Sequence, residues 1–382
     1  MGIDVGTHMT RVVVGEFSKG EKNPKVIGIG ESETEGLRHG YITDQKEAVK
    51  SLKNALSQAE KTSGIKKIRR AYVALGGVTL RGEISTAVAI ISKADSEVTK
   101  LDINRALEEC EEGLHLGNKK IIQIFPVSFR LDGKEVFGNP EGMHGNKLEV
   151  RALIITCIHK HLEELLGVLG EAGITPIDII PGAIAGATIA LSKKQKIAGS
   201  ALVNIGSETT TLAVFENDTL ISFYTFSIGT TDVTHDIALG LKISLEEAEA
   251  LKLGDSSLEY SKKKLDEIIE ARFSDIFELI ENHLKKIKRS ELLPAGVVFI
   301  GGGANTPRLE EFSKNALHLP SKVATTNIFG NIKTKLRDPA WFVALGLILS
   351  PQDSESYGEN SLSNIFKDTK TWIKSSLKQL MP

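Results

Sequence analysis

The stretch "DVGT" at residues 4–7 follows an apolar, strand-like start of the chain, and a near-repeat of it, "NIGSETT" at residues 204–210, follows a second apolar run. Each stretch places a glycine and hydroxyl residues directly after a strand, where backbone N–H groups and hydroxyls can surround phosphate oxygens. A carboxylate such as Asp4 can in addition hold a hydrated magnesium ion. Taken alone, each stretch is also compatible with an ordinary turn.

A third glycine turn lies in "VVFIGGGAN" at residues 297–305, where three glycines follow an apolar strand. Without Cβ atoms, this backbone can approach a flat or phosphorylated ligand closely. A tight strand-to-helix turn with a purely structural role is the alternative. Together, the three turns predict that two related half-domains close on one nucleotide.

Between these turns the chain alternates between strand-like and helix-like segments. Residues 1–77 predict strands and then a helix that ends before Gly64, and residues 78–157 predict a small α+β unit. The strand pattern restarts after residue 198, whereas residues 231–293 are predominantly helical and charged. After Leu349 the apolar pattern stops in a polar stretch with the composition of a solvated linker. These patterns predict a mixed α/β protein of more than one domain.

The composition excludes several classes of protein. With 47 basic and 49 acidic residues among 382, the net charge of -2 gives no overall basic field for nucleic acid. The two cysteines, Cys110 and Cys157, argue against a disulfide framework and for a cytosolic location. No signal peptide and no apolar run long enough to cross a bilayer is recognised, so we expect a protein that does not span a membrane.

The order of the three turns resembles the phosphate-1, phosphate-2 and adenosine layout of the actin, Hsp70 and sugar-kinase superfamily. Four segments, "YVALGGVTLRGEI", "EVTKLDINRALEEC", "FPVSFRLDGKEVFGNPEGMHGNKLEVRALIITC" and "SLEEAEALK", resemble the FtsA family of bacterial cell-division proteins, and the resemblance extends through residues 1–349. It implies an α/β, actin-like ATPase fold of two related halves around a nucleotide cleft, with a small inserted α+β subdomain. The implied organisation is subdomain 1A (residues 1–77 and 158–197), inserted subdomain 1C (78–157), subdomain 2A (198–230 and 294–349), subdomain 2B (231–293), a linker (350–361) and an amphipathic membrane-targeting helix (362–382).

The resemblance also implies which residues bind ATP and Mg²⁺. The expected nucleotide-binding residues are Asp4, Gly6 and Thr7 at phosphate-1, with Asp4 also on magnesium; Asn204, Gly206, Ser207, Thr209 and Thr210 at phosphate-2; Gly301, Gly302 and Gly303 on the adenosine side; and Glu249 and Lys252 near the ribose and base. Without the family pattern, Glu249 and Lys252 are better explained as a solvated helix face, because charged residues at i and i+3 commonly pair there.

Two positions depart from the hydrolysing relatives. Asn204 replaces the usual carboxylate of the second turn, and a neutral amide holds magnesium less firmly. Ile180 stands where those relatives have an acidic or Gln side chain, and an aliphatic group can neither orient a water nor accept its proton. We therefore predict ATP as a chiefly structural ligand, with weak or absent hydrolysis and no catalytic residue. Met1 lies so close to Asp4 that the first strand is expected to be short, either because the chain begins later than its relatives or because its start is misassigned.

The C-terminal segment has the pattern of a helix that lies on a membrane surface. Its apolar side chains gather on one arc of a helical wheel, bordered by lysines that would meet anionic lipid. The apolar residues are Ile365, Phe366, Trp372, Ile373, Leu377 and Leu380, and the lysines are Lys367, Lys370, Lys374 and Lys378. A helix docked on the protein's own core is the alternative.

The implied function is a self-polymerising adaptor. In the family, the region matching residues 231–293 receives the C-terminal tail of the tubulin-like division protein FtsZ, for which Arg272, Lys285 and Lys286 are candidate cations. The expected partners are this tail, further copies of the chain in a filament, an anionic membrane surface and later cell-division proteins, with no nucleic acid. The expected location is the cytoplasmic face of the cell membrane at the division site, as a peripheral protein. The alternatives are a small-molecule kinase and a pilus-type actin-like scaffold of the same superfamily.

Overall fold

Contacts within the computed structural model, which describes residues 1–18, 23–254, 260–326 and 334–356, divide the chain into two units. The first unit contains Met1–Ile84, Leu116–Val127 and Leu153–Ile348, and therefore carries all three glycine turns. The second unit contains Ser85–His115 and Ser128–Ala152, which lie inside the predicted inserted subdomain, and also the segment that begins at Leu349. The site described below belongs wholly to the first unit.

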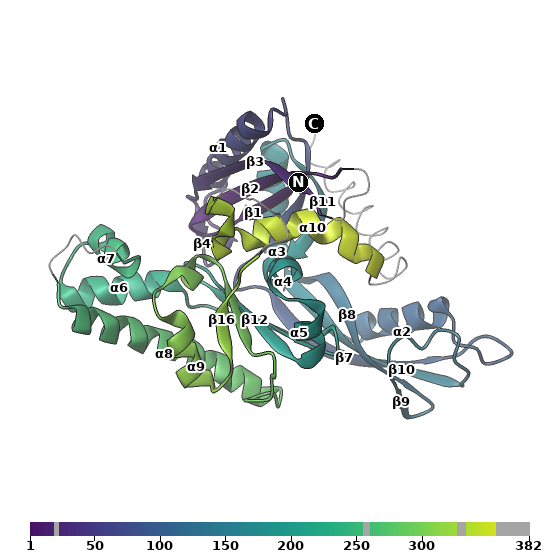
Figure 1. Ribbon diagram of the computed structural model, residues 1–382. Helices are drawn as coiled ribbons and strands as arrows, with labels where there is room; N and C mark the ends of the chain where they lie inside the picture. The colour runs from purple at the N-terminus through teal and green to yellow at the C-terminus, as the bar shows by residue number, and fades with distance from the viewer. Residues whose placement is uncertain (19–22, 255–259, 327–333, 357–382) are drawn as a thin grey trace. The chain divides into compact units, whose positions relative to one another are not determined.

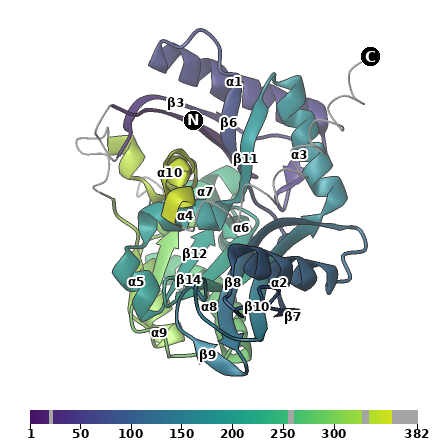
Figure 2. The ribbon, with the colours of Figure 1, turned by 90° about the vertical axis from the view of Figure 1, so that its right-hand side faces the viewer.

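A five-stranded sheet in the first unit has the order β11-β6-β1-β2-β3. β1 pairs in antiparallel fashion with β2 and in parallel with β6, which pairs in parallel with β11. α1 lies against β2 and β3, begins at the N-cap Asp44 and ends at Gly64, as the sequence predicts (Figure 2). The elements of this part are β1 (Gly2–Val5), β2 (Met9–Glu16), β3 (Lys25–Glu33), β4 (Leu37–Arg38), β5 (Tyr41–Ile42), α1 (Gln45–Ser63), β6 (Arg70–Leu75), α3 (His159–Glu171) and β11 (Thr175–Pro181).

The second sheet of the first unit repeats this arrangement. Its strands have the order β16-β15-β12-β13-β14, and β12 pairs in antiparallel fashion with β13 and in parallel with β15. Helix α8 packs against both α6 and α9, at the lower left of Figure 1. The elements are α5 (Lys193–Ala198), β12 (Ser200–Ile205), β13 (Thr210–Glu216), β14 (Thr219–Phe226), α6 (Thr230–Leu241), α7 (Leu245–Lys252), α8 (Lys262–Lys286), β15 (Val297–Ile300), η1 (Gly302–Asn305), α9 (Leu309–Leu317) and β16 (Ser321–Val323). The two related halves predicted from the paired turns are thus present.

Small and apolar residues form α4 (Gly182–Ala190) and the first turns of α10 (Phe342–Ser356), which pack on each other. α4 contacts strands of both sheets, and α10 follows η2 (Thr334–Arg337) and η3 (Pro339–Trp341). A Cβ at Gly346 would lie 1.8 Å from the Ala185 carbonyl oxygen, so the close crossing of α10 over α4 requires glycine there. Residues 342–349 are buried, or glycine, on every side of α10, as expected for a helix enclosed by other elements.

α10 differs from the expectation in one respect. It ends at Ser356, whereas the composition predicts a solvated linker from residue 350. Proline has no N–H to donate, so the continuation of α10 past Pro351 lacks one hydrogen bond of the helix. The last turns of α10 therefore overlap the first residues of the predicted linker.

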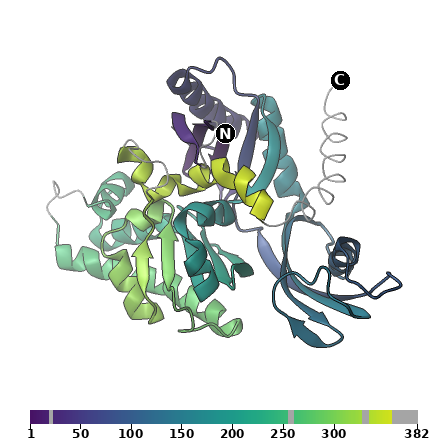
Figure 3. The same cartoon turned by 45° about the vertical axis from the view of Figure 1, so that its right-hand side comes forward.

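The second unit is an α+β arrangement, as predicted. Its strands are parts of β7 (Arg81–Ile90), β10 (Lys147–Ile158), β8 (Lys119–Leu131) and β9 (Lys134–Val136), in that sheet order. α2 (Lys100–Glu112) lies beside these strands in Figure 3. Thr99 and Asp102 form a capping box that fixes its N-terminus.

The predicted membrane-surface helix falls outside the described residues, and with it every apolar and lysine residue assigned to it above. Across the part of the chain that the structure describes, no helix combines the length and apolar character needed to cross a bilayer.

Candidate functional site

The first phosphate turn connects β1 to β2. The Gly6 N–H donates to the Met9 carbonyl at 3.2 Å, which closes a tight turn directly after Asp4 and Val5. Asp4 lies opposite Arg11 on β2, which lies opposite Glu31 on β3, so the three charges alternate along one face of the sheet. Burial raises the pKa of Asp4 to about 6, against the opposing effect of Arg11. A cation at this carboxylate would offset that cost of burial.

The second phosphate turn has the same geometry. The Gly206 N–H donates to the Thr209 carbonyl at 2.8 Å, as Gly6 does to Met9. The carbonyls of Gly206 and Ser207 accept from Thr230 and Thr231 at 3.0 and 2.7 Å, which fixes the turn on the N-terminus of α6. The positive end of a helix dipole favours an anion at such a place.

Thr210, one of the residues expected at phosphate-2, lies in a buried position. Its side chain is fully buried, and its hydroxyl donates to the Ile228 carbonyl at 2.9 Å. The Thr210 hydroxyl therefore links the start of β13 to the residues that follow β14.

A hairpin that the sequence analysis did not single out contacts both turns. β4 and β5 form a two-stranded sheet whose tip is His39 and Gly40. The Gly40 N–H donates to the Thr7 hydroxyl oxygen at 2.9 Å, and the His39 N–H donates to the Glu208 carboxylate. Thr7 still has its own hydroxyl proton available for a phosphate oxygen.

The three glycines after β15 have different roles. Gly301 adopts φ +88°, and a Cβ there would lie 2.3 Å from Asn204 Oδ1; a Cβ at Gly303 would lie 2.4 Å from the Ile205 side chain. Both glycines are therefore required by packing against the second phosphate turn. A Cβ at Gly302 would meet nothing within 4 Å, so the space beside this exposed residue is open to a ligand. This open space fits the predicted adenosine position.

Glu249 and Lys252 do not form a solvated helix face. Lys252 is only 4% exposed, and its ammonium donates to the Glu249 carboxylate, to Thr234 Oγ1 at 2.9 Å and to the Thr230 carbonyl at 3.3 Å. Burial lowers the pKa of Lys252, against the effect of Glu249. Burial also acts to raise the pKa of Glu249, but hydrogen bonds from Lys252 and Thr234 outweigh it and keep that pKa below its usual range. Lys252 thus holds the partly exposed carboxylate of Glu249, on α7, against Thr234 in the first turns of α6.

The residues relevant to hydrolysis lie on β11 of the first sheet and on β12 of the second. Ile180 lies opposite Ala74, which lies opposite Asp4, so Ile180 faces the same side as Asp4 two strands away, about 10 Å. Asp178 lies opposite Tyr72, further back along β11, and accepts from the Ile179 N–H. Asn204 is the last but one residue of β12 and is partly buried beside Gly301.

The candidate cations for a peptide partner lie on α8. Arg272 makes two hydrogen bonds to Asp236, Nε to Oδ2 at 2.6 Å and Nη2 to Oδ1 at 3.1 Å, and a contact to Asp275 at 3.1 Å. Its charge is therefore already paired with two carboxylates. Lys285 and Lys286 are exposed, and Lys285 lies 3.5 Å from Glu281.

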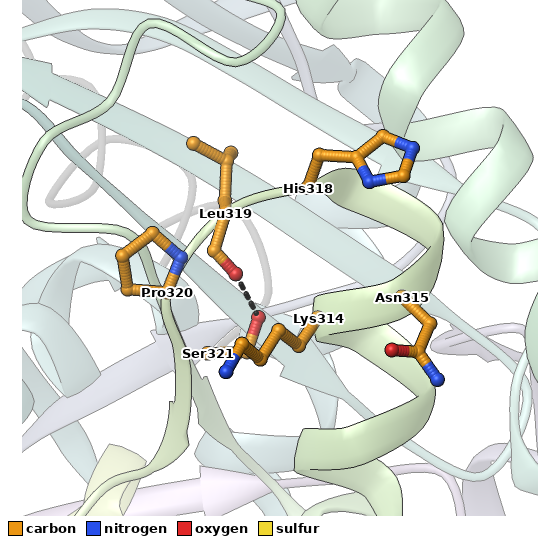
Figure 4. A pocket seen from close by; sticks show the side chains of 6 residues that line it. All are labelled: Lys314, Asn315, His318, Leu319, Pro320 and Ser321. Atoms are coloured by element: carbon orange, nitrogen blue, oxygen red, sulfur yellow. Dashed lines mark hydrogen bonds between the residues drawn. The ribbon is translucent and has the colours of Figure 1, made fainter.

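A surface pocket of about 710 Å³ lies away from these residues, at the end of α9 and the start of β16 (Figure 4). Its lining residues are Lys314, Asn315, His318, Leu319, Pro320 and Ser321. The Ser321 hydroxyl donates to the Leu319 carbonyl at 3.1 Å, so this polar group is committed to the loop itself. The pocket shares no residue with the glycine turns.

Comparison with known proteins agrees with the family resemblance. The family model described as "Cell division protein FtsA" matches residues 201–346, and the one described as "SHS2 domain inserted in FTSA" matches residues 77–156. "Cell division protein FtsA" of Bacillus subtilis (strain 168) is 32% identical over 370 residues, which cover 91% of this chain and 82% of that protein. The protein of the same name from Pseudomonas aeruginosa is 26% identical over 380 residues, which cover 94% and 90%.

Two solved structures show the same fold at low sequence identity. The PilM-PilN type IV pilus biogenesis complex contains a chain with a TM-score of 0.71 and 17% identity, covering 91% of this chain and 97% of that one. MreB5 of Spiroplasma citri bound to ADP has a TM-score of 0.52 and 15% identity, covering 94% and 97%. The predicted actin-like fold with an inserted subdomain is thus confirmed, and the chain belongs to the FtsA family of cell-division proteins.

Proposed function

We propose that this protein is an ATP-binding, self-polymerising adaptor that tethers the FtsZ ring to the inner face of the cytoplasmic membrane during cell division and recruits later division proteins. The observation that carries the proposal is the pair of equivalent phosphate turns, each closed by the same Gly N–H contact, with a glycine turn packed against the second. Relatives of this fold include MreB5 structures bound to ADP and to AMPPNP.

The described residues suit ATP in the following way. The N–H groups and hydroxyls after Gly6 and Gly206 would bind the phosphates, and the adenosine would lie beside Gly302. Glu249, held by Lys252, offers its carboxylate oxygens to ribose hydroxyls. Asp4 is the carboxylate for Mg²⁺, which would neutralise phosphate charge there.

Hydrolysis is expected to be slow. A general base must reach the attacking water, directly or through a second water. Ile180 offers no such group on the Asp4 face, and Asp178 lies further back beside Tyr72. With Asn204 in place of a second carboxylate, bound ATP would persist and act mainly on the conformation of the protein.

Two further parts of the proposal concern partners. The FtsZ tail would bind along α8, with the exposed Lys285 and Lys286 as cations and Arg272 contributing only if its pair with Asp236 opens. Attachment to the membrane would use the helix of residues 362–382. One such helix binds reversibly, so a filament that presents many copies would bind much more firmly.

Co-sedimentation with anionic liposomes tests this proposal. The full chain is compared with a chain that ends at Ser356, which keeps α10 complete, and with the full-length Trp372→Ser variant, each with and without ATP and Mg²⁺. We expect pelleting that increases with ATP, decreases for Trp372→Ser and is lost on truncation. Equal pelleting by the full and the shortened chain, or none by either, would contradict the adaptor proposal.

A further inference from the structure

The hairpin tip, His39 and Gly40, lies against three loops of the first unit. The Gly40 N–H donates to Thr7 and the His39 N–H donates to Glu208. In addition, the His39 carbonyl accepts from the Val78 N–H at 3.1 Å. His39 Nδ1 lies 3.0 Å from the Glu208 carbonyl oxygen, within hydrogen-bonding distance. One dipeptide thus joins the first phosphate turn, the second phosphate turn and the loop after β6.

The tip has little freedom to move. His39 and Gly40 both have positive φ, 49° and 76°, as a two-residue hairpin turn requires, and a Cβ at Gly40 would lie 2.4 Å from the Gly77 Cα. Behind the tip, Tyr41 lies 5.1 Å from the ring of the buried His161. The backbone of the hairpin therefore presents its N–H groups at fixed places.

Glu208 needs an explanation because it lies in the middle of the second phosphate turn, between Ser207 and Thr209. A carboxylate at this place would repel the phosphates that the turn is shaped to bind. Its side chain is instead only 14% exposed and turned to the hairpin, with the His39 N–H as donor and the Arg38 guanidinium 3.8 Å away. Arg38 is 73% exposed, so the N–H bond is the stronger constraint.

We propose that the hairpin tip is a strap between the two phosphate turns and that Glu208 is the positioning residue that fastens it. The strap holds the turns at the separation that a polyphosphate needs and keeps the Glu208 charge directed away from the phosphates. This inference rests on the proposed binding of ATP. The affinity for the phosphates, but not the affinity for adenosine, then depends on the contact between Glu208 and the His39 N–H, which does not touch the ligand.

The test measures binding of ATP with Mg²⁺ and of adenosine by titration calorimetry to the full chain. Glu208→Ala removes the acceptor, Glu208→Gln keeps an oxygen for the His39 N–H, and Glu216→Ala is the matched control, since Glu216 also pairs with an arginine, Arg289, at 2.7 Å. We expect Glu208→Ala to weaken ATP binding about tenfold and adenosine binding less than twofold. Glu208→Gln should recover most of the ATP affinity, and Glu216→Ala should change neither.

Amide hydrogen exchange of the ligand-free protein provides a second readout. Glu208→Ala should increase exchange at the His39 and Gly40 amides and leave the core strand β12 unchanged, which also confirms that the variant is folded. Unchanged or tighter ATP binding by Glu208→Ala, or an equal loss for ATP and adenosine, would overturn the strap while leaving ATP binding intact. Failure of the unmodified chain to bind ATP would overturn the proposed function, and the strap with it.

Discussion

The Lys252→Met variant tests the least expected feature of the site, the buried ammonium on α7. Methionine keeps most of the length and apolar contact of the lysine stem but removes all three donors. The change leaves the Thr230 carbonyl and Thr234 hydroxyl without this partner, and leaves Glu249 with one hydrogen bond fewer. Because the Glu249 side chain is 42% exposed, water can replace part of its loss.

The expected cost follows from these contacts. Removing one partner from a fully buried ion pair costs about 3–5 kcal/mol, and the exposure of Glu249 places this pair below that range. We expect the free energy of unfolding in urea to fall by about 2 kcal/mol for Lys252→Met. If Glu249 binds the ribose, affinity for ATP and for adenosine should fall by the same factor, unlike the selective loss expected for Glu208→Ala.

The matched control is Lys263→Met on α8, whose partner Glu267 lies 3.8 Å away and whose side chain is 89% exposed. This surface pair should contribute less than about 0.5 kcal/mol. The reasoning would be refuted if the two methionine variants unfolded at the same urea concentration, because Lys252 would then behave as a solvated lysine. An unchanged affinity for both ligands would remove Glu249 from the ribose position.

Three further predictions concern other parts of the first unit. Burial lowers the pKa of His161 from 6.5 to about 4, so on acidification the imidazole is protonated in the unfolded chain before it is protonated in the folded protein. The neutral His161 therefore favours the folded state fully above pH 6.5, and about 3 kcal/mol of the free energy of unfolding is lost as the pH falls to 4. Urea unfolding of His161→Gln at a series of pH values should not show this loss. Gly302→Ala should keep the unfolding temperature but weaken ATP binding, whereas Gly303→Ala should lower the unfolding temperature, because only the second Cβ meets protein atoms; the opposite ranking would contradict the assignment. The double variant Asp236→Asn with Asp275→Asn, which removes both carboxylates that pair with Arg272, should tighten binding of an FtsZ-tail peptide in fluorescence anisotropy, and equal affinity would exclude Arg272 from that surface.

Much of the fold follows from local patterns in the sequence. The two turns with a glycine after a strand, and the helix from Gln45 to its glycine cap, depend on neighbouring residues and are therefore readable from the chain alone. The burial of Thr210 was not readable in this way, because it depends on the packing of β13 beside Ile228, 18 residues further along the chain.

Other features depend on contacts between distant segments. The spacing of Glu249 and Lys252 is that of an exposed ion pair, and only the packing of α7 on α6 makes Lys252 buried. The pairs Arg272 with Asp236 and His39 with Glu208 join residues of different elements, so neither leaves a local signal. A His-Gly pair is compatible with a hairpin turn, but it does not reveal what the tip contacts.

The central claim is that ATP is a bound, long-lived ligand of the paired phosphate turns. The most direct measurement is titration calorimetry of the full chain with ATP and Mg²⁺, followed by chromatographic analysis of the nucleotide recovered from the complex. We predict one nucleotide per chain, recovered mainly as ATP. No binding, or rapid and complete conversion to ADP, would contradict the account.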